Sequence, residues 1–253
     1  MTSATVIAPL CRNFINGRWV ESRSGQTIER RNPANVNELV SVAPLSTREE
    51  VREAIAAAKA AVADRFVEIV VERARKLKVG NGLDADVDVG PLVDENQLKT
   101  VLRYIETGKK EARLLVGGGR MSGAEHDNGY FVAPTVFDHV RWDSVIAQEE
   151  IFGPVLSVIR VPDFEEALRV ANSVKYGLSS SIYTNDASRI FAFIDRIETG
   201  MTHVNAPTVA SEAQLPFGGM KATGVGLREM GRVAIDFYTE LKAVYIDYTG
   251  RKR

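Results

Sequence analysis

The chain has 253 residues, 45% of them hydrophobic and 26% charged, which suits one or two globular domains with a sizeable core. Its 32 basic and 33 acidic residues nearly cancel, and this balance excludes the basic surface that binds nucleic acid. No apolar run is long enough to span a bilayer. A single cysteine cannot form a disulfide framework, and the three histidines are too widely separated in sequence for metal-ligand spacing.

The opening residues, 1–45, are expected to form a small β-rich segment. Asn16 and Gly17 stand between two short extended runs, and Asn-Gly in that setting is the strongest short-range signal of a β-hairpin. Further strands are predicted over residues 27–31 and 39–43, with a turn at Asn32-Pro33.

A long helix is predicted over residues 46–80. Ser46 precedes Glu49 by three residues, which is the spacing of a capping box. Apolar residues then recur at helical spacing with no Gly or Pro before Gly80, namely Val51, Ile55, Ala58, Val62, Phe66, Val70 and Leu77. A helix of about 30 residues would be about 45 Å long, which is unusual in a compact domain of this size.

Residues 81–240 alternate strand and helix patterns. Strands are predicted over residues 113–116, 131–137, 155–161, 179–183 and 201–205, and helices over residues 94–110, 163–171, 185–197 and 226–238. Asp163 and Asn185 occupy N-cap positions. Strands separated by short helices favour right-handed crossovers and a parallel sheet, so we predict an α/β domain. Residues 241–248 alternate apolar and polar, which predicts a C-terminal strand with an open edge.

Polar groups gather at two loops. The run QEEIFGPV, residues 148–155, places Glu149 and Glu150 before a buried strand, but neighbours on an extended segment point to opposite sides and cannot act as an acid and base pair. Asn205 begins a loop at the carboxyl end of a predicted parallel strand, where open sheets bind ligands. We find no self-sufficient active site, because Cys11 is far in sequence from every His and no serine elbow, Walker A or dinucleotide glycine motif occurs.

Four segments together carry a family resemblance: QEEIFGPVLSVI, YGLSSSIYT, VNAP and PFGGMKATGVG, which start at residues 148, 176, 204 and 216. They resemble successive blocks of the catalytic domain of the aldehyde dehydrogenase superfamily, and the FINGRWV run from Phe14 is similar to the family's first part. The resemblance implies a parallel-sheet catalytic-domain core over residues 81–240, a β-rich segment over 1–45, a long connecting helix over 46–80 and a terminal strand and tail over 241–253.

The resemblance also implies roles for individual residues. Glu150 matches a glutamate that holds the nicotinamide ribose, Phe152 an aromatic beside the nicotinamide, and Gln97 a position near the adenosine. Phe217 and Asn205 are expected in the aldehyde pocket. The nucleotide-binding domain, the general-base glutamate and the nucleophilic cysteine of the family have no counterpart, so we expect no catalytic residue and an internal deletion joined near residues 60–63.

Three hypotheses follow. The chain is a truncated member of a family that oxidises small aldehydes with NAD or NADP, inactive alone, with weak or absent cofactor binding. Alternatively, it is half of a split enzyme that another chain completes, or a non-catalytic binding or oligomerisation module. We further expect a cytoplasmic protein that self-associates through its C-terminal strand.

Overall fold

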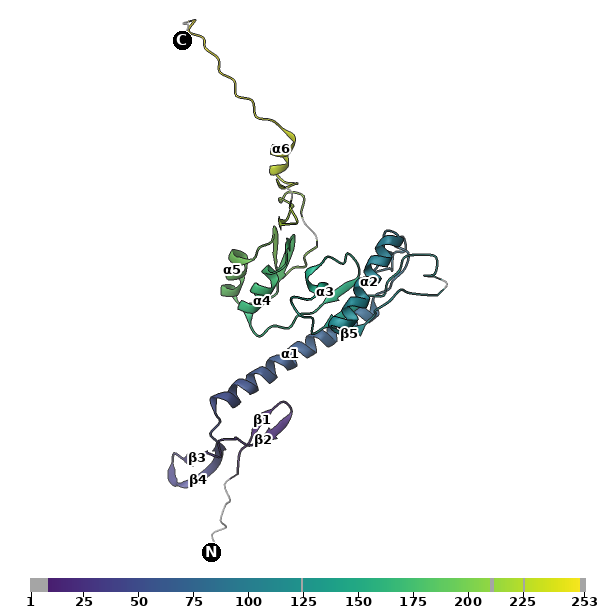
Figure 1. Cartoon of the computed structure of the whole chain (residues 1–253). Coiled ribbons are helices and arrows are strands. Elements are labelled where there is room, and N and C mark those ends of the chain that lie inside the picture. The colour runs from purple at the N-terminus through teal and green to yellow at the C-terminus, as the bar shows by residue number, and fades with distance from the viewer. Residues whose placement is uncertain (1–8, 124, 210–211, 225, 251–253) are drawn as a thin grey trace.

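The computed structural model describes residues 9–123, 125–209, 212–224 and 226–250, and Figure 1 shows an elongated α/β arrangement around one long helix. The N-terminal part contains β1 (Asn13–Ile15), β2 (Arg18–Val20), β3 (Thr27–Asn32), β4 (Asn35–Pro44) and the helix α1 (Arg48–Lys76). The middle part contains α2 (Glu95–Glu111), β5 (Arg113–Val116), β6 (Thr135–Asp138), α3 (Val145–Gln148) and β7 (Val155–Ser157). The last part contains α4 (Phe164–Asn172), β8 (Tyr176–Gly177), β9 (Ser179–Ile182), α5 (Ala187–Arg196), β10 (Met201–Val204), β11 (Met220–Lys221) and α6 (Val233–Tyr238).

The predicted N-terminal hairpin forms as β1 and β2. Asn16 and Gly17 adopt φ angles of 51° and 74°, the left-handed conformations that a tight turn between twisted strands requires. Phe14 pairs with Trp19 across the ladder, and their ring centroids lie 5.0 Å apart. The second hairpin, β3 with β4, is also antiparallel.

Helix α1 begins one residue later than predicted. The N-cap is Thr47, whose side chain accepts from the Glu50 N–H while the Glu50 carboxylate accepts from the Thr47 N–H, so the Ser46–Glu49 capping box is wrong. The physical reason is tertiary: Glu50 also accepts hydrogen bonds from Ser22 and from the backbone of Arg23, which draws it towards the N-terminal hairpins. The Ser46 hydroxyl instead accepts from Asn13.

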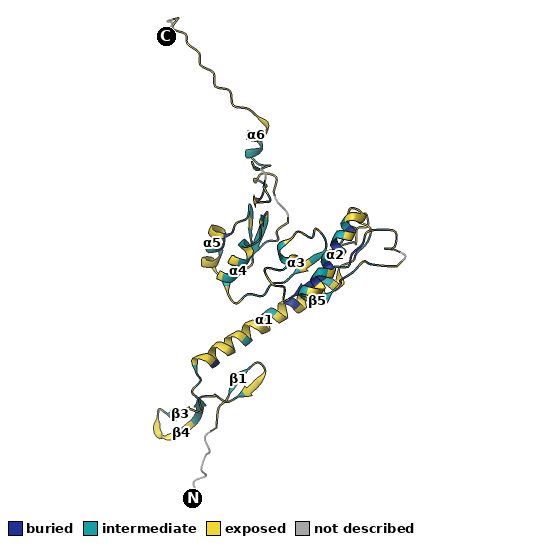
Figure 2. Cartoon of the chain, viewed as in Figure 1, coloured by how far each residue is buried: buried dark blue, intermediate teal, exposed yellow. Residues whose placement is uncertain are grey.

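The core lies between α2 and the mixed sheet β5-β6-β7, in which β5 runs antiparallel and β7 parallel to β6. Val101 and Ile105 of α2 and Phe137 of β6 are fully buried there. The C-terminal half of α1 covers the same sheet through Val67 and Val71. Its N-terminal half, by contrast, is largely exposed (Figure 2).

A buried carboxylate ties this sheet to α1. Asp138 at the end of β6 is 2% exposed and accepts two hydrogen bonds from the Arg160 guanidinium, at 2.9 and 2.7 Å. Arg160 also donates to Asp64 of α1. Burial alone would raise the pKa of Asp138, but the hydrogen bonds from Arg160 and from the His139 N–H, together with the positive charge of Arg160, outweigh it and hold the pKa below its ordinary value.

The expected continuous parallel sheet is wrong, although the α/β class is confirmed. Parallel pairing occurs between β6 and β7 and between β9 and β10, but these strands belong to separate small sheets of the described chain. The reason is that β7 is short and the next strand along the chain, β8, pairs antiparallel with β11 instead of extending the β7 edge.

The predicted C-terminal strand is also wrong. Residues 241–248 are irregular, and their apolar side chains are exposed, including Leu241, Val244 and Ile246. An alternating pattern forms a strand only where a second strand supplies hydrogen bonds, and nothing in the described chain pairs with this one. The preceding helix, α6, is shorter than predicted, and Asp186 rather than Asn185 caps α5. No described helix has the length and apolarity that crossing a bilayer requires.

Candidate functional site

The 148–155 loop is docked on one face of α2. Gln97, Val101 and Tyr104 lie four and three residues apart, so they share a side of that helix. The carboxamide of Gln97 donates to the carbonyls of Ile151 and Phe152, at 3.0 Å each. The end of the loop is fixed to the sheet, since the Pro154 carbonyl accepts from the Thr135 N–H at 2.9 Å.

The two neighbouring glutamates have different environments in the structure. Glu149 caps the C-terminus of α3, and its carboxylate accepts a 2.7 Å hydrogen bond from the Tyr104 hydroxyl. That hydrogen bond raises the pKa of Tyr104 above its ordinary value. Glu150 is exposed, and within the described chain its carboxylate has no hydrogen bond or salt bridge. Glu150 is therefore the glutamate that can accept hydrogen bonds from a ligand.

Phe152 presents its ring to solvent. It is 75% exposed and adopts a φ of 53°, a left-handed conformation that is unusual for an aromatic residue. The Gln97 hydrogen bond to its carbonyl holds the backbone in that conformation. An exposed aromatic ring beside a free carboxylate can stack on a planar group and accept from a nearby hydroxyl.

Gly153 allows the loop to approach α2 closely. A Cβ atom at this position would lie 2.6 Å from Cγ2 of Val101, a distance that real Cβ atoms do not tolerate. Since Val101 is fully buried in the core, it has no room to move away. The glycine is therefore required by the contact with the helix.

Asn205 has a structural role at the end of β10. Its side-chain oxygen accepts from the Thr184 N–H at 2.9 Å, and its side-chain nitrogen donates to the Thr184 carbonyl at 3.0 Å. Two serines of β9 hold the same loop: Ser181 donates to the Ala206 carbonyl and Ser179 to the Thr208 carbonyl. These contacts position the start of the loop, whose residues 210–211 lie outside the described chain.

Phe217, expected in the aldehyde pocket, is half-buried. Its backbone pairs with that of Glu229, through hydrogen bonds of 2.7 and 2.9 Å. Thus the structure brings Gln97 against the loop that carries Glu150 and Phe152, while Asn205 and Phe217 belong to the last part of the chain. No hydrogen bond in the described chain joins the two sets.

Cys11 lies apart from all of these residues. It is exposed, and the small groove beside it, about 130 Å³, is lined by residues of the N-terminal segment only. In the described chain, no three His, Cys, Asp or Glu side chains gather as metal ligands would.

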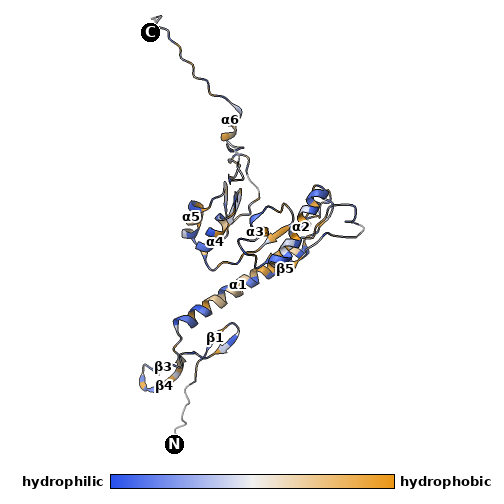
Figure 3. Ribbon diagram, in the orientation of Figure 1, coloured by the Kyte–Doolittle hydropathy of each residue, from blue (hydrophilic) through white to orange (hydrophobic). Residues whose placement is uncertain are grey.

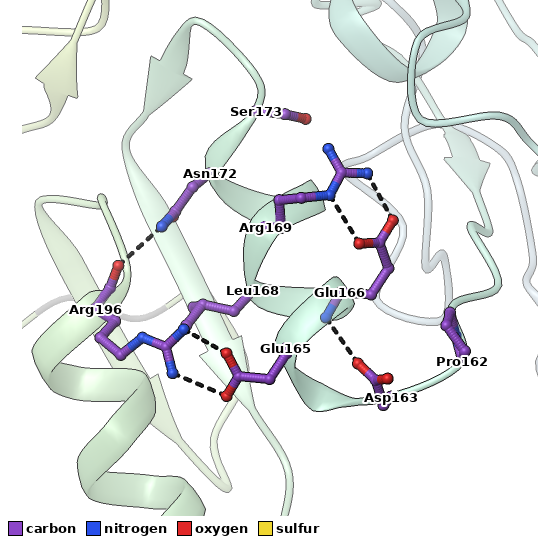
Figure 4. A pocket seen from close by; sticks show the side chains of 9 residues that line it. All are labelled: Pro162, Asp163, Glu165, Glu166, Leu168, Arg169, Asn172, Ser173 and Arg196. Atoms are coloured by element: carbon purple, nitrogen blue, oxygen red, sulfur yellow. Dashed lines mark hydrogen bonds and ion pairs between the residues drawn. The ribbon is translucent and has the colours of Figure 1, made fainter.

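The larger grooves do not contain the candidate residues. One groove of about 780 Å³ lies between α4 and α5, and Figure 4 shows that ion pairs line it. Arg169 binds Glu166 and Arg196 binds Glu165, each through two hydrogen bonds. Because these charges are paired within the chain, the groove offers little free charge to a ligand.

Sequence reasoning missed the residues that hold the loops. Tyr104 carries no motif, and although the β9 serines lie in the YGLSSSIYT segment, that segment gave them no role. The roles of these residues depend on partners that lie 45, 29 and 25 residues away in sequence. The helical phase of Gln97, Val101 and Tyr104 was the available signal, because it places them on one face of α2.

Most of the chain matches one known protein family. The aldehyde dehydrogenase family matches residues 60–244, a range that includes the 148–155 loop and Phe217. The match begins at residue 60, inside α1, and the FINGRWV run that resembles the family's first part lies before it. Over 184 residues the chain is 46% identical to alpha-ketoglutaric semialdehyde dehydrogenase of Bacillus subtilis (strain 168), covering 72% of this chain and 38% of that relative. The chain thus spans less than half the length of this relative.

Solved protein structures are also similar to this chain. HpcC from Thermus thermophilus is 43% identical with a TM-score of 0.67, and the alignment covers 74% of this chain and 38% of that one. Betaine aldehyde dehydrogenase from Staphylococcus aureus, solved in complex with NAD+, is 32% identical with a TM-score of 0.67, covering 70% of this chain and 35% of that one.

Proposed function

This chain belongs to the aldehyde dehydrogenase family, and we propose that it is an internally truncated member that keeps one wall of the cofactor site and does not oxidise aldehydes alone. The family reaction is oxidation of an aldehyde to a carboxylate with NAD or NADP. One observation carries the proposal: the only cysteine in the sequence, Cys11, lies in the N-terminal segment, away from Glu150, Phe152 and Phe217. Without a thiolate at the reacting carbon, the covalent route is closed.

The residues present fit only part of a dinucleotide. Glu150 can accept from ribose hydroxyls and the Phe152 ring can pack beside the nicotinamide. Both are exposed, however. They line neither the groove of about 780 Å³ nor a second groove, of about 570 Å³, between α1 and β5. Gln97, assigned to the adenosine side, uses its carboxamide on the loop itself. A single wall leaves most of a ligand in water, so weak or absent NAD binding is expected.

An assay tests this proposal directly. The purified chain is mixed with NAD or NADP and a panel of small aldehydes, and the expected result is no NADH or NADPH above the rate without protein. Calorimetric titration of NAD should show little heat, and Glu150→Gln should leave the titration unchanged. A clear rate that Cys11→Ala abolishes would overturn the proposal.

A second candidate, the half of a split enzyme, is favoured by an apolar groove of about 420 Å³ beside Gly153 and Pro154. Its walls are α1 and the sheet, through residues that include Val70, Leu77, Val136 and Leu156. A separate chain that carries the nucleotide-binding domain and the cysteine would cover this groove and complete the site of Glu150. Mixing the two proteins should then restore NADH production, whereas this chain with a nucleotide-binding domain whose cysteine is replaced should not.

Self-association is also proposed, but on a different basis from the one expected. The C-terminal residues form no strand edge in the described chain, so the edge does not support it. The support is that many large apolar side chains of the described chain are exposed, since apolar surface that gathers into patches of several hundred Å² favours association.

A further inference from the structure

Helix α1 carries an apolar stripe on one side. We define the α1 stripe as Val51, Ile55, Ala58, Val62, Phe66 and Ile69, which follow one another at intervals of three or four residues. The larger members are exposed to solvent, from 38% at Ile69 to 72% at Val62. Spacings of this kind form the seam by which one helix packs on another.

The α1 stripe is not the side of the helix that packs on the sheet. Val67 and Val71 make that contact, and Val67 lies five residues after Val62, which is about 140° further around a helix of 3.6 residues per turn. Figure 2 shows the N-terminal half of α1 as mostly exposed, and Figure 3 shows that hydrophilic and more hydrophobic residues alternate along it. The chain's own core therefore leaves the stripe open.

The N-terminal hairpin extends this apolar surface. A groove of about 360 Å³ between β1 and α1 is lined by residues that include Phe14, Val51, Ile55 and Ala58. Phe14 is 61% exposed and packs at a tilt against Trp19, which is 67% exposed. We define the α1 surface as the α1 stripe together with Phe14 and Trp19.

The stripe is continuous across the point where the family match begins. Val51, Ile55 and Ala58 precede residue 60, while Val62, Phe66 and Ile69 follow it. Both halves stay in phase because α1 runs from Arg48 to Lys76 without interruption. The full seam therefore depends on the way this chain joins its N-terminal segment to the matched domain.

We propose that two copies of this chain pair through the α1 surface. In a two-fold dimer the same patch meets itself, and a seam of three- and four-residue spacing is complementary to an identical seam. The α1 surface is also large enough. Its seven large apolar side chains, all members except Ala58, each leave on the order of 100 Å² exposed, or roughly 700 Å² together. Each partner contributes roughly 800 Å² to a standard interface.

The oligomeric state tests the proposal. Light scattering of the full chain over a range of concentrations should give the mass of a dimer. Val62→Glu or Phe66→Glu places an unpaired carboxylate in the contact and should raise the dimer Kd more than about 100-fold. Leu83→Glu, at a residue 92% exposed in the loop after α1, is the matched control and should leave the dimer intact. Circular dichroism checks that each variant keeps its helix content.

Disulfide trapping gives a second, independent readout. In a Cys11→Ser background, Ala58→Cys with Val62→Cys places thiols at the middle of the seam, where they meet in a parallel or an antiparallel pair. Mild oxidation should link two chains much faster than it does in a Leu83→Cys control. A wild-type monomer at all concentrations, a dimer that both Glu variants leave unchanged, or equal cross-linking in the control would overturn the proposal. These readouts measure mass and are independent of enzyme activity.

Discussion

Tyr104 donates a 2.7 Å hydrogen bond to the carboxylate of Glu149, across the contact between α2 and the 148–155 loop. Seven residues earlier on the same helix face, Gln97 holds the carbonyl of Phe152. The helix thus fixes the loop near its start and in its middle and uses one of its two glutamates, so Glu150 and the ring of Phe152 are left for a ligand.

Loss of the Tyr104 hydroxyl should weaken this docking. Tyr104→Phe removes a hydrogen bond to a charged but solvated group, so the free energy of unfolding should fall by about 0.5–1.5 kcal/mol. Urea denaturation measures the change, and hydrogen exchange at residues 149–153 should become faster. Glu150→Gln is the control and should change stability by less than about 0.5 kcal/mol. Equal effects of the two variants would contradict the assigned division of roles.

A methyl group at Gly153 should strain the contact with α2. Gly153→Ala is expected to destabilise by about 1–3 kcal/mol, because the new Cβ meets Val101 in a packed core. In a Val101→Ala background, Gly153→Ala should lower the free energy of unfolding by at least about 0.5 kcal/mol less than it does in the wild type. Gly82→Ala is the control, since a Cβ at that position would have no atom within 4 Å. Strict additivity of Gly153→Ala and Val101→Ala would show that another contact is responsible.

Removal of the Arg160 side chain should lower the free energy of unfolding. Arg160→Met leaves the Asp138 carboxylate buried without its guanidinium, and breaking such a pair costs about 3 kcal/mol. The pKa of Asp138 should then rise, because burial is opposed mainly by the remaining hydrogen bond from the His139 N–H. Asp138→Leu with Arg160→Met should recover most of the loss. Arg141→Met breaks an exposed ion pair with Asp143 and should change stability by less than about 1 kcal/mol. A similar loss in both Arg variants would rule out burial as the cause.

The carboxylate of Glu50 should make stability depend on acid pH. Hydrogen bonds from the backbone of Thr47 and Arg23 and from the Ser22 hydroxyl lower its pKa from 4.5 to about 2. A lowered folded-state pKa means that this stabilisation is complete above pH 4.5 and is lost as the pH falls towards 2. Glu50→Gln should therefore flatten the dependence of Tm on pH in this window. Glu49→Gln, in the same helical turn, is the control; if it flattens the profile equally, the capping box is not the source.

Local signals predicted much of the fold. The Asn16-Gly17 turn, the uninterrupted apolar spacing of α1 and the Asp163 N-cap each depend on residues close in sequence, and the structure confirms all three. The family resemblance of the 148–155 loop and of residues 216–226 also lies in short runs of sequence, and the family match includes both.

Strand pairing and side-chain partners were decided by tertiary structure alone. Residues 241–248 have the alternation of a strand, yet they form none in the described chain because a strand needs a second backbone to bond with. Likewise, the resemblance singles out Glu150, but residue type and spacing do not distinguish it from Glu149. Only the fold shows that Tyr104, 45 residues away, binds Glu149 and leaves Glu150 free. Short-range conformational preference is encoded locally, whereas hydrogen-bond partners far apart in sequence meet only once the chain has packed.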